Sequence, residues 1–139
     1  MADVGNSSSH LNFWKKRLGR VPDSVWEQTE LETLVLAENE LREVPELVGR
    51  LKKLRTLDLG HNHLTHVPEA LGRLDGLTDF LYLHDNRLSA LPASLEKLTR
   101  LRYLNLSQNA FAELSTCVTR MTALTELRAS DNNLAELPD

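Results

Sequence analysis

The sequence has little of what several large classes of protein require. Its one cysteine, Cys117, cannot form an internal disulfide, which excludes the small secreted folds that disulfides hold together. No apolar run approaches the roughly 18 residues that a membrane-spanning helix needs, and the N-terminal segment lacks the basic and apolar regions of a secretory signal. We therefore expect no membrane association and a cytoplasmic protein, unless it is exported by a signal that is not visible in the sequence.

The charge balance is slightly acidic, and motifs of catalytic sites are missing. The 20 acidic and 16 basic residues give a net charge of −4, whereas a dedicated nucleic-acid binder needs a basic surplus. The sequence contains no glycine-rich phosphate loop, no H-E-x-x-H, no G-x-S-x-G and no C-x-x-C. All the histidines precede residue 85, far in the chain from Cys117, which therefore makes a poor candidate nucleophile. We expect neither enzyme activity nor a cofactor.

What the sequence does have is an internal repeat. Asparagines recur at spacings of 23, 24, 23 and 23 residues, each in the frame L-x-L-x-x-N-x-L with small variations. The alternation Leu-x-Leu predicts a short strand with its leucines turned inward. The amide after the strand has donors and an acceptor for backbone groups of the turn, so we expect an asparagine ladder with a structural role. Its members are Asn39, Asn62, Asn86, Asn109 and Asn132.

Each repeat also has a second half, in which Val-Pro or Leu-Pro precedes two further apolar positions. Proline fits the first turn of a helix, and an acidic residue followed four positions later by a basic one supports such a turn. We therefore expect short helical turns, α or 3-10, on the side opposite the strands. The same frame fits residues 11–22 as a degenerate first repeat, with Lys16 in place of asparagine. The alternative for this segment is an amphipathic capping helix over residues 9–18.

This repeat resembles the leucine-rich repeat family, and its L-P-x-x-L variety is similar to intracellular scaffold proteins, bacterial effectors and Roco-type GTPases. The resemblance covers residues 11–138. It implies an α/β fold: a right-handed solenoid with a parallel concave β-sheet and short helical turns on the convex side. We expect residues 10–139 to form the repeat domain, with five and a half repeats of which the last is incomplete, and residues 1–9 to be a disordered or capping tail.

The resemblance also implies a function, the binding of a protein partner through the concave face without chemistry of its own. An alternative is that the chain is the recognition portion of a larger enzyme or bacterial effector, such as a ligase, kinase or GTPase. A sugar-binding face is a further alternative, which only the two tyrosines favour. The apolar end of the last repeat, around Leu127, Leu134 and Leu137, predicts self-association, because terminal repeats normally need polar caps.

Alternate strand positions point to the concave face and define the candidate binding residues. Tyr82 and Tyr103 fall there, and tyrosine is favoured in interface hot spots. The alternative is that the two tyrosines form a cross-strand pair that stabilises the sheet. Trp14 and Phe80 are further candidates. Phe80 lies in the 24-residue repeat, where the extra residue predicts a bulge in the strand, and the alternative is an insertion that the solenoid tolerates without a functional role. The candidate partner-binding residues are Asp58, Tyr82, His84, Tyr103, Asn105 and Arg128.

The pattern His61-x-His63-x-x-His66 suggests a metal site, but the repeat frame does not require the three side chains to converge. The frame instead places His61 between Glu38 and Asp85, at equivalent positions of strands about 4.8 Å apart. We expect a ladder of charge pairs there and no metal ion.

Overall fold

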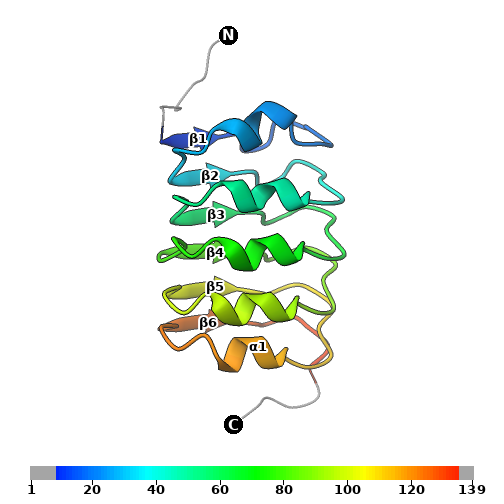
Figure 1. Ribbon diagram of the computed structural model, residues 1–139. Coiled ribbons are helices and arrows are strands. Elements are labelled where there is room, and N and C mark those ends of the chain that lie inside the picture. Colours follow the sequence, from blue (N-terminus) through cyan, green and yellow to red (C-terminus); the bar gives the residue numbers. More distant parts are fainter. Residues whose placement is uncertain (1–8, 135–139) are drawn as a thin grey trace.

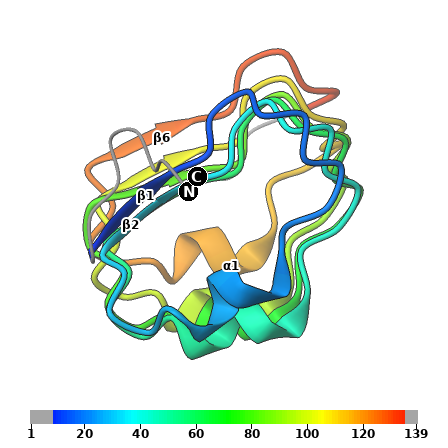
Figure 2. The same ribbon diagram turned by 90° about the horizontal axis from the view of Figure 1, so that it is seen from above.

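The computed structural model describes residues 9–134, which form a stack of repeats in which short strands alternate with helical turns (Figure 1). The strands form one six-stranded parallel sheet in the order of the chain, and the helices lie on one side of it (Figure 2). The predicted α/β solenoid is therefore confirmed, while most of the predicted tail and Leu137 lie outside the described residues. The strands are β1 (His10–Asn12), β2 (Thr33–Val35), β3 (Thr56–Asp58), β4 (Phe80–Tyr82), β5 (Tyr103–Asn105) and β6 (Glu126–Arg128).

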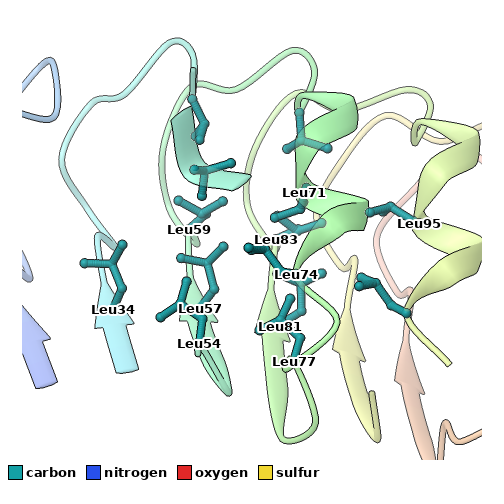
Figure 3. Close-up of a cluster of buried hydrophobic side chains, with 14 of the residues drawn as sticks. Leu34, Leu54, Leu57, Leu59, Leu71, Leu74, Leu77, Leu81, Leu83 and Leu95 are labelled. Atoms are coloured by element: carbon teal, nitrogen blue, oxygen red, sulfur yellow. The ribbon is translucent and has the colours of Figure 1, made fainter. Parts of the chain in front are cut away.

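The leucine alternation builds the core from stacked copies of one position. Leu34, Leu57, Leu81 and Leu104 are partners across β2 to β5, and all four are fully buried. Each packs among the leucines of its neighbours and those of the helical turns (Figure 3). Burial of one leucine side chain stabilises the fold by about 1.5–3 kcal/mol. A three-residue strand cannot bury its leucines alone, so the sheet depends on the stack more than on local propensity.

The helical turns on the other side are mostly 3-10 helices. Pro45, Pro68 and Pro92 have extended backbone angles and stand directly before the first helical residue. In the last of these turns Ser115 replaces proline, and the segment that follows is an α-helix. No helix in residues 9–134 has the length and apolar character needed to span a bilayer. The helices are η1 (Asp23–Glu27), η2 (Glu46–Arg50), η3 (Glu69–Arg73), η4 (Ala93–Lys97) and α1 (Thr116–Thr119).

The asparagines satisfy backbone groups of two successive repeats. The Oδ1 atom of Asn62 accepts the N–H groups of Asn39 and Leu41, at 2.9 and 3.0 Å. Its Nδ2 donates to three carbonyl oxygens of its own and the preceding repeat, at 2.9–3.1 Å. These bonds pair backbone groups that would otherwise be buried without partners. Burial decreases towards the last repeat, from buried Asn39, Asn62 and Asn86 to partly buried Asn109 and Asn132.

The residue before each asparagine has a left-handed backbone conformation, which ends the strand and turns the chain. A positive φ is costly for a residue with a Cβ, by about 1–2 kcal/mol. The bonds of the following asparagine hold the turn in this conformation. The residues are Glu38, His61, Asp85, Gln108 and Asp131, with φ between 54° and 57°.

The first repeat contains a strand, so the alternative of a capping helix is wrong. Leu11 of β1 is buried and pairs with Leu34 of β2. The backbone N–H of Lys16, which replaces asparagine, donates to Oδ1 of Asn39 at 2.8 Å. The degenerate repeat therefore needs no asparagine of its own for this hydrogen bond, because Asn39 of the next repeat accepts the backbone N–H of its turn.

The extra residue of the 24-residue repeat lies before β4 and not within it, which corrects the predicted bulge. Phe80 pairs with Thr56 and Tyr103 in the register of the other strands, and its side chain is exposed on the face opposite the leucines. The one additional residue is Thr78, between Leu77 and Asp79 in the loop that leads into β4. The loop absorbs the insertion because the strand itself is held in register by its neighbours on both sides.

Candidate functional site

The face of the sheet that points away from the helices, which we call the open face, consists of the residues between the inward leucines. It is the face predicted to be concave. Parallel register aligns equivalent positions of successive repeats into rows across the strands. Tyr103 lies in the row before the middle one, and His84 in the row after it. The middle row contains the other four predicted residues, Asp58, Tyr82, Asn105 and Arg128.

Phe80, Tyr82 and Tyr103 form one continuous cluster, which we call the aromatic patch. The Phe80 and Tyr82 rings on β4 are nearly parallel, with centroids 5.6 Å apart. The Tyr103 ring on β5 lies 5.3 Å from both. Because register pairs Tyr103 with Phe80, the two tyrosines contact each other diagonally. Such ring pairs stabilise a fold by about 0.5–1.5 kcal/mol beyond the contribution of the buried area. Phe80 nevertheless remains 40% exposed, so the aromatic patch faces solvent.

His84 extends this row of rings towards His61. Its ring lies 5.8 Å from that of Tyr82 and 4.6 Å from that of His61. It occupies the space beside Gly60, where an added Cβ would come within 2.5 Å of the imidazole. Burial, together with the charge of His61, lowers the pKa of His84, and its buried Nδ1 has no hydrogen-bond partner within residues 9–134. At pH 7 His84 is therefore a mainly neutral part of the surface.

Asp58 has a carboxylate that forms no ion pair with another residue of the segment 9–134. Its Oδ1 accepts the N–H of Gly60 at 2.9 Å. Desolvation raises the pKa of this carboxyl group, and the Gly60 hydrogen bond and the two histidines offset the shift only in part. The strands of the described chain carry one other carboxylate, Glu126, which lies 2.6 Å from Arg128. Asp58 is thus the strand carboxylate that forms no ion pair.

Asn105 and Arg128 are held by neighbours on their own strands. Asn105 accepts the N–H of Ser107 at 3.0 Å and donates to the Tyr103 hydroxyl at 3.4 Å. The hydrogen bond from Arg128 to Glu126 and the charge of that carboxylate raise the pKa of the guanidinium. Together with His84, Asn105 and Arg128 line a polar hollow at the end of β5 and β6.

An ion-pair network next to the aromatic patch is missing from the sequence-based prediction. Asp79 lies 3.1 Å from Arg102 and 3.5 Å from Arg55, and the three residues border the aromatic patch. Desolvation raises the pKa of the Asp79 carboxyl, but hydrogen bonds from Arg102 and Thr78 and the charges of both arginines outweigh it and lower the pKa. The signal was present in the sequence, because these residues occupy the position before the strand in successive repeats.

The histidine-rich segment forms one imidazole–carboxylate pair instead of the expected ladder. His61 Nδ1 lies 2.6 Å from Asp85 Oδ2. Glu38, the other expected partner, accepts a hydrogen bond from the Trp14 indole at 2.8 Å. Trp14 therefore lies with the first repeat, and within residues 9–134 it makes no ring contact with the aromatic patch. In the same part of the chain, no group of three His, Cys, Asp or Glu residues is arranged to hold a metal ion.

Cys117 lies in α1, on the side of the stack opposite the open face, and is buried. Burial raises the pKa of its thiol. Because the thiolate is the reactive form, this environment suits a structural cysteine and not a nucleophile.

Comparison with known proteins agrees with the repeat geometry. A family model described as a leucine-rich repeat region matches residues 19–129. The chain belongs to the leucine-rich repeat family. Among solved structures, a leucine-rich repeat protein of Leptospira interrogans is similar over 92% of this chain, with a TM-score of 0.69 and 24% identity. This chain spans 44% of the length of that protein. No curated protein matches the chain significantly.

In this leucine-rich repeat protein, the fold does not require a particular residue type at the open-face positions. The inward leucines form the core, and the asparagines pair the backbone of the turns. Thr33, Thr56, Phe80, Tyr103 and Glu126 occupy the same position on successive strands, which shows that the sheet accepts very different side chains there. The open face is therefore where the side chains differ most from one repeat to the next at this position.

Proposed function

We propose that this leucine-rich repeat protein is an interaction module that binds a partner protein through its open face. The observation that carries the proposal is the aromatic patch. The equivalent strand positions of β2 and β3 hold threonine, so the repeat does not require Phe80 and Tyr103 to be aromatic. Aromatic side chains at the centre of an open face are favoured as hot spots of protein interfaces.

The surroundings of the patch support the same proposal. Asp79 and its two arginines lie on one side of it, and His84 and Asp58 lie on the other. An apolar centre with a polar rim is the usual composition of a protein interface. Ring contacts also stabilise the sheet, and this second role is compatible with binding. The proposal is the same whether the chain acts alone or as the recognition portion of a larger protein.

The experiment is a capture assay with the purified chain immobilised and cell lysate of its source organism as the input. Tyr82→Ala combined with Tyr103→Ala should abolish capture, because truncation of a hot-spot tyrosine costs about 2 kcal/mol or more, equivalent to about 30-fold in affinity. The matched control is Arg50→Ala combined with Arg73→Ala, in the last turns of η2 and η3. This control should retain capture, since exposed charges contribute little each.

Both double variants need circular dichroism and a melting curve to show that they are folded. If the arginine pair abolishes capture and the tyrosine pair leaves it intact, the binding face lies on the helical side and the proposal is wrong.

A further inference from the structure

We propose that the open face receives an arginine of its partner, with the guanidinium on the carboxylate of Asp58 and against the ring of Tyr82. This inference rests on the proposed function and specifies the kind of partner. The partner is a protein segment that presents an arginine next to apolar residues. Two features carry it: a carboxylate without a counter-ion, and an aromatic ring in the adjacent strand at the same register position.

The charge of Asp58 is compensated only in part by its surroundings. The Gly60 N–H is its hydrogen-bond partner, and among residues 9–134 it has no ion pair with any lysine, arginine or histidine. The side chain is partly buried, and a carboxylate that loses water without gaining a cation costs free energy. A cationic group supplied by the partner would compensate for this loss of water.

His84 does not supply that cation at neutral pH, and the hydrogen bond of His61 goes to Asp85. His84 is mainly neutral because burial and the neighbouring His61 lower its pKa. His61 directs Nδ1 to Asp85, at 2.6 Å. On β4, the register partner of Asp58 is the Tyr82 phenol, whose pKa burial and the neighbouring groups raise, so that it stays protonated. On β2 the register partner is Val35, which carries no charge.

The geometry favours arginine over lysine. Asp58 and Tyr82 are register partners on β3 and β4, and adjacent strands lie about 4.8 Å apart. A planar guanidinium can stack on the phenol ring and still direct its N–H groups to the neighbouring carboxylate. The ammonium of lysine offers no flat surface for the ring. The exposed ring of Phe80, stacked beside Tyr82, provides apolar surface for the residues that flank the arginine.

The other strong charges around the aromatic patch are already paired within the protein. Arg55 and Arg102 share Asp79, and Arg128 is paired with Glu126. An acidic partner would have to compete with these carboxylates for the arginines. A basic partner meets an open carboxylate at Asp58, so charge complementarity selects it.

The test selects peptides from a random library displayed on phage against the immobilised full chain at neutral pH. We expect arginine to be enriched, and we expect the enriched peptides to depend on Tyr82 and Tyr103. Their affinities are then measured by fluorescence anisotropy for the wild type and two variants. Asp58→Asn keeps an oxygen for the Gly60 N–H and should weaken binding by about tenfold or more. Glu126→Gln, the matched control, removes a carboxylate that is already paired and should change affinity by less than about threefold.

A change in the peptide gives the reciprocal test, since citrulline has the shape of arginine without its charge. Citrulline should weaken binding to the wild type and have little effect on binding to Asp58→Asn. Peptides that depend on the tyrosines but need no basic residue, or that bind Asp58→Asn as tightly as the wild type, would overturn the inference and leave the proposed function intact. If the library yields no peptide that depends on the tyrosines, the result counts against both.

Discussion

Asn62→Ala tests how much of the fold depends on the asparagine ladder. The Asn62 side chain is 5% exposed and makes five hydrogen bonds to the backbone. Alanine leaves the N–H groups of Asn39 and Leu41 without their acceptor in a buried turn. The three carbonyl oxygens that lose the Nδ2 donor are less costly, because carbonyl groups tolerate incomplete pairing better than N–H groups do.

The expected loss follows from the two N–H groups. A buried donor without a partner costs about 1–3 kcal/mol, so the pair predicts a loss of about 2–6 kcal/mol in the free energy of unfolding. A domain of this size is stable by only about 5–15 kcal/mol. Asn132 provides the internal comparison, since it accepts one N–H, that of Phe111, and is partly exposed. Water can replace its bonds, so Asn132→Ala should cost about 1 kcal/mol.

The measurement is urea denaturation followed by far-UV circular dichroism and by the fluorescence of Trp26, which is fully buried in the first repeat. We expect Asn62→Ala to lower the midpoint well below that of Asn132→Ala, with an unchanged slope in both. Equal midpoints for the two variants, or an Asn62→Ala midpoint equal to that of the wild type, would refute the argument that buried turn donors depend on the ladder.

Two further predictions concern His84 and the end of the stack. The pKa of His84 is lowered in the folded protein, so below pH 6.5 the unfolded chain binds a proton that the folded chain does not, and stability falls with decreasing pH until the folded pKa is reached. Between pH 7 and pH 5, the melting temperature of His84→Phe should therefore fall by less than that of the wild type. An equal fall in both proteins would contradict this. Leu127, 37% exposed, lines an apolar hollow with Leu114, Val118 and Leu134. We predict concentration-dependent self-association there, weakened by Leu127→Lys, and light scattering that finds a strict monomer at high concentration would show it to be wrong.

The sequence by itself determined the solenoid, because every repeat must bury its leucines at the same positions and the sequence therefore shows the period of the fold. Leu34 and its equivalents must leave water together, and period-2 alternation then assigns each neighbouring residue to the core or to the open face. This reasoning also placed Asp58, Tyr82, Asn105 and Arg128 on the open face without any structure. It also favoured a strand in the first repeat, where Lys16 replaces asparagine, because Leu11 keeps the inward period, and the structure then excluded the capping helix.

Only the tertiary structure decided which of these side chains meet. Alternation assigns a face, whereas contacts depend on register, rotamer and competing partners, which exist only once the strands are side by side. Glu38 binds the Trp14 indole rather than His61, since that donor is also within reach. Asp79 becomes the shared acceptor of two arginines because Arg55 and Arg102 hold the equivalent position before the strands to either side of β4. The His84 ring fills the space left by a glycine one strand away, an arrangement that the periodic pattern of a single chain does not contain.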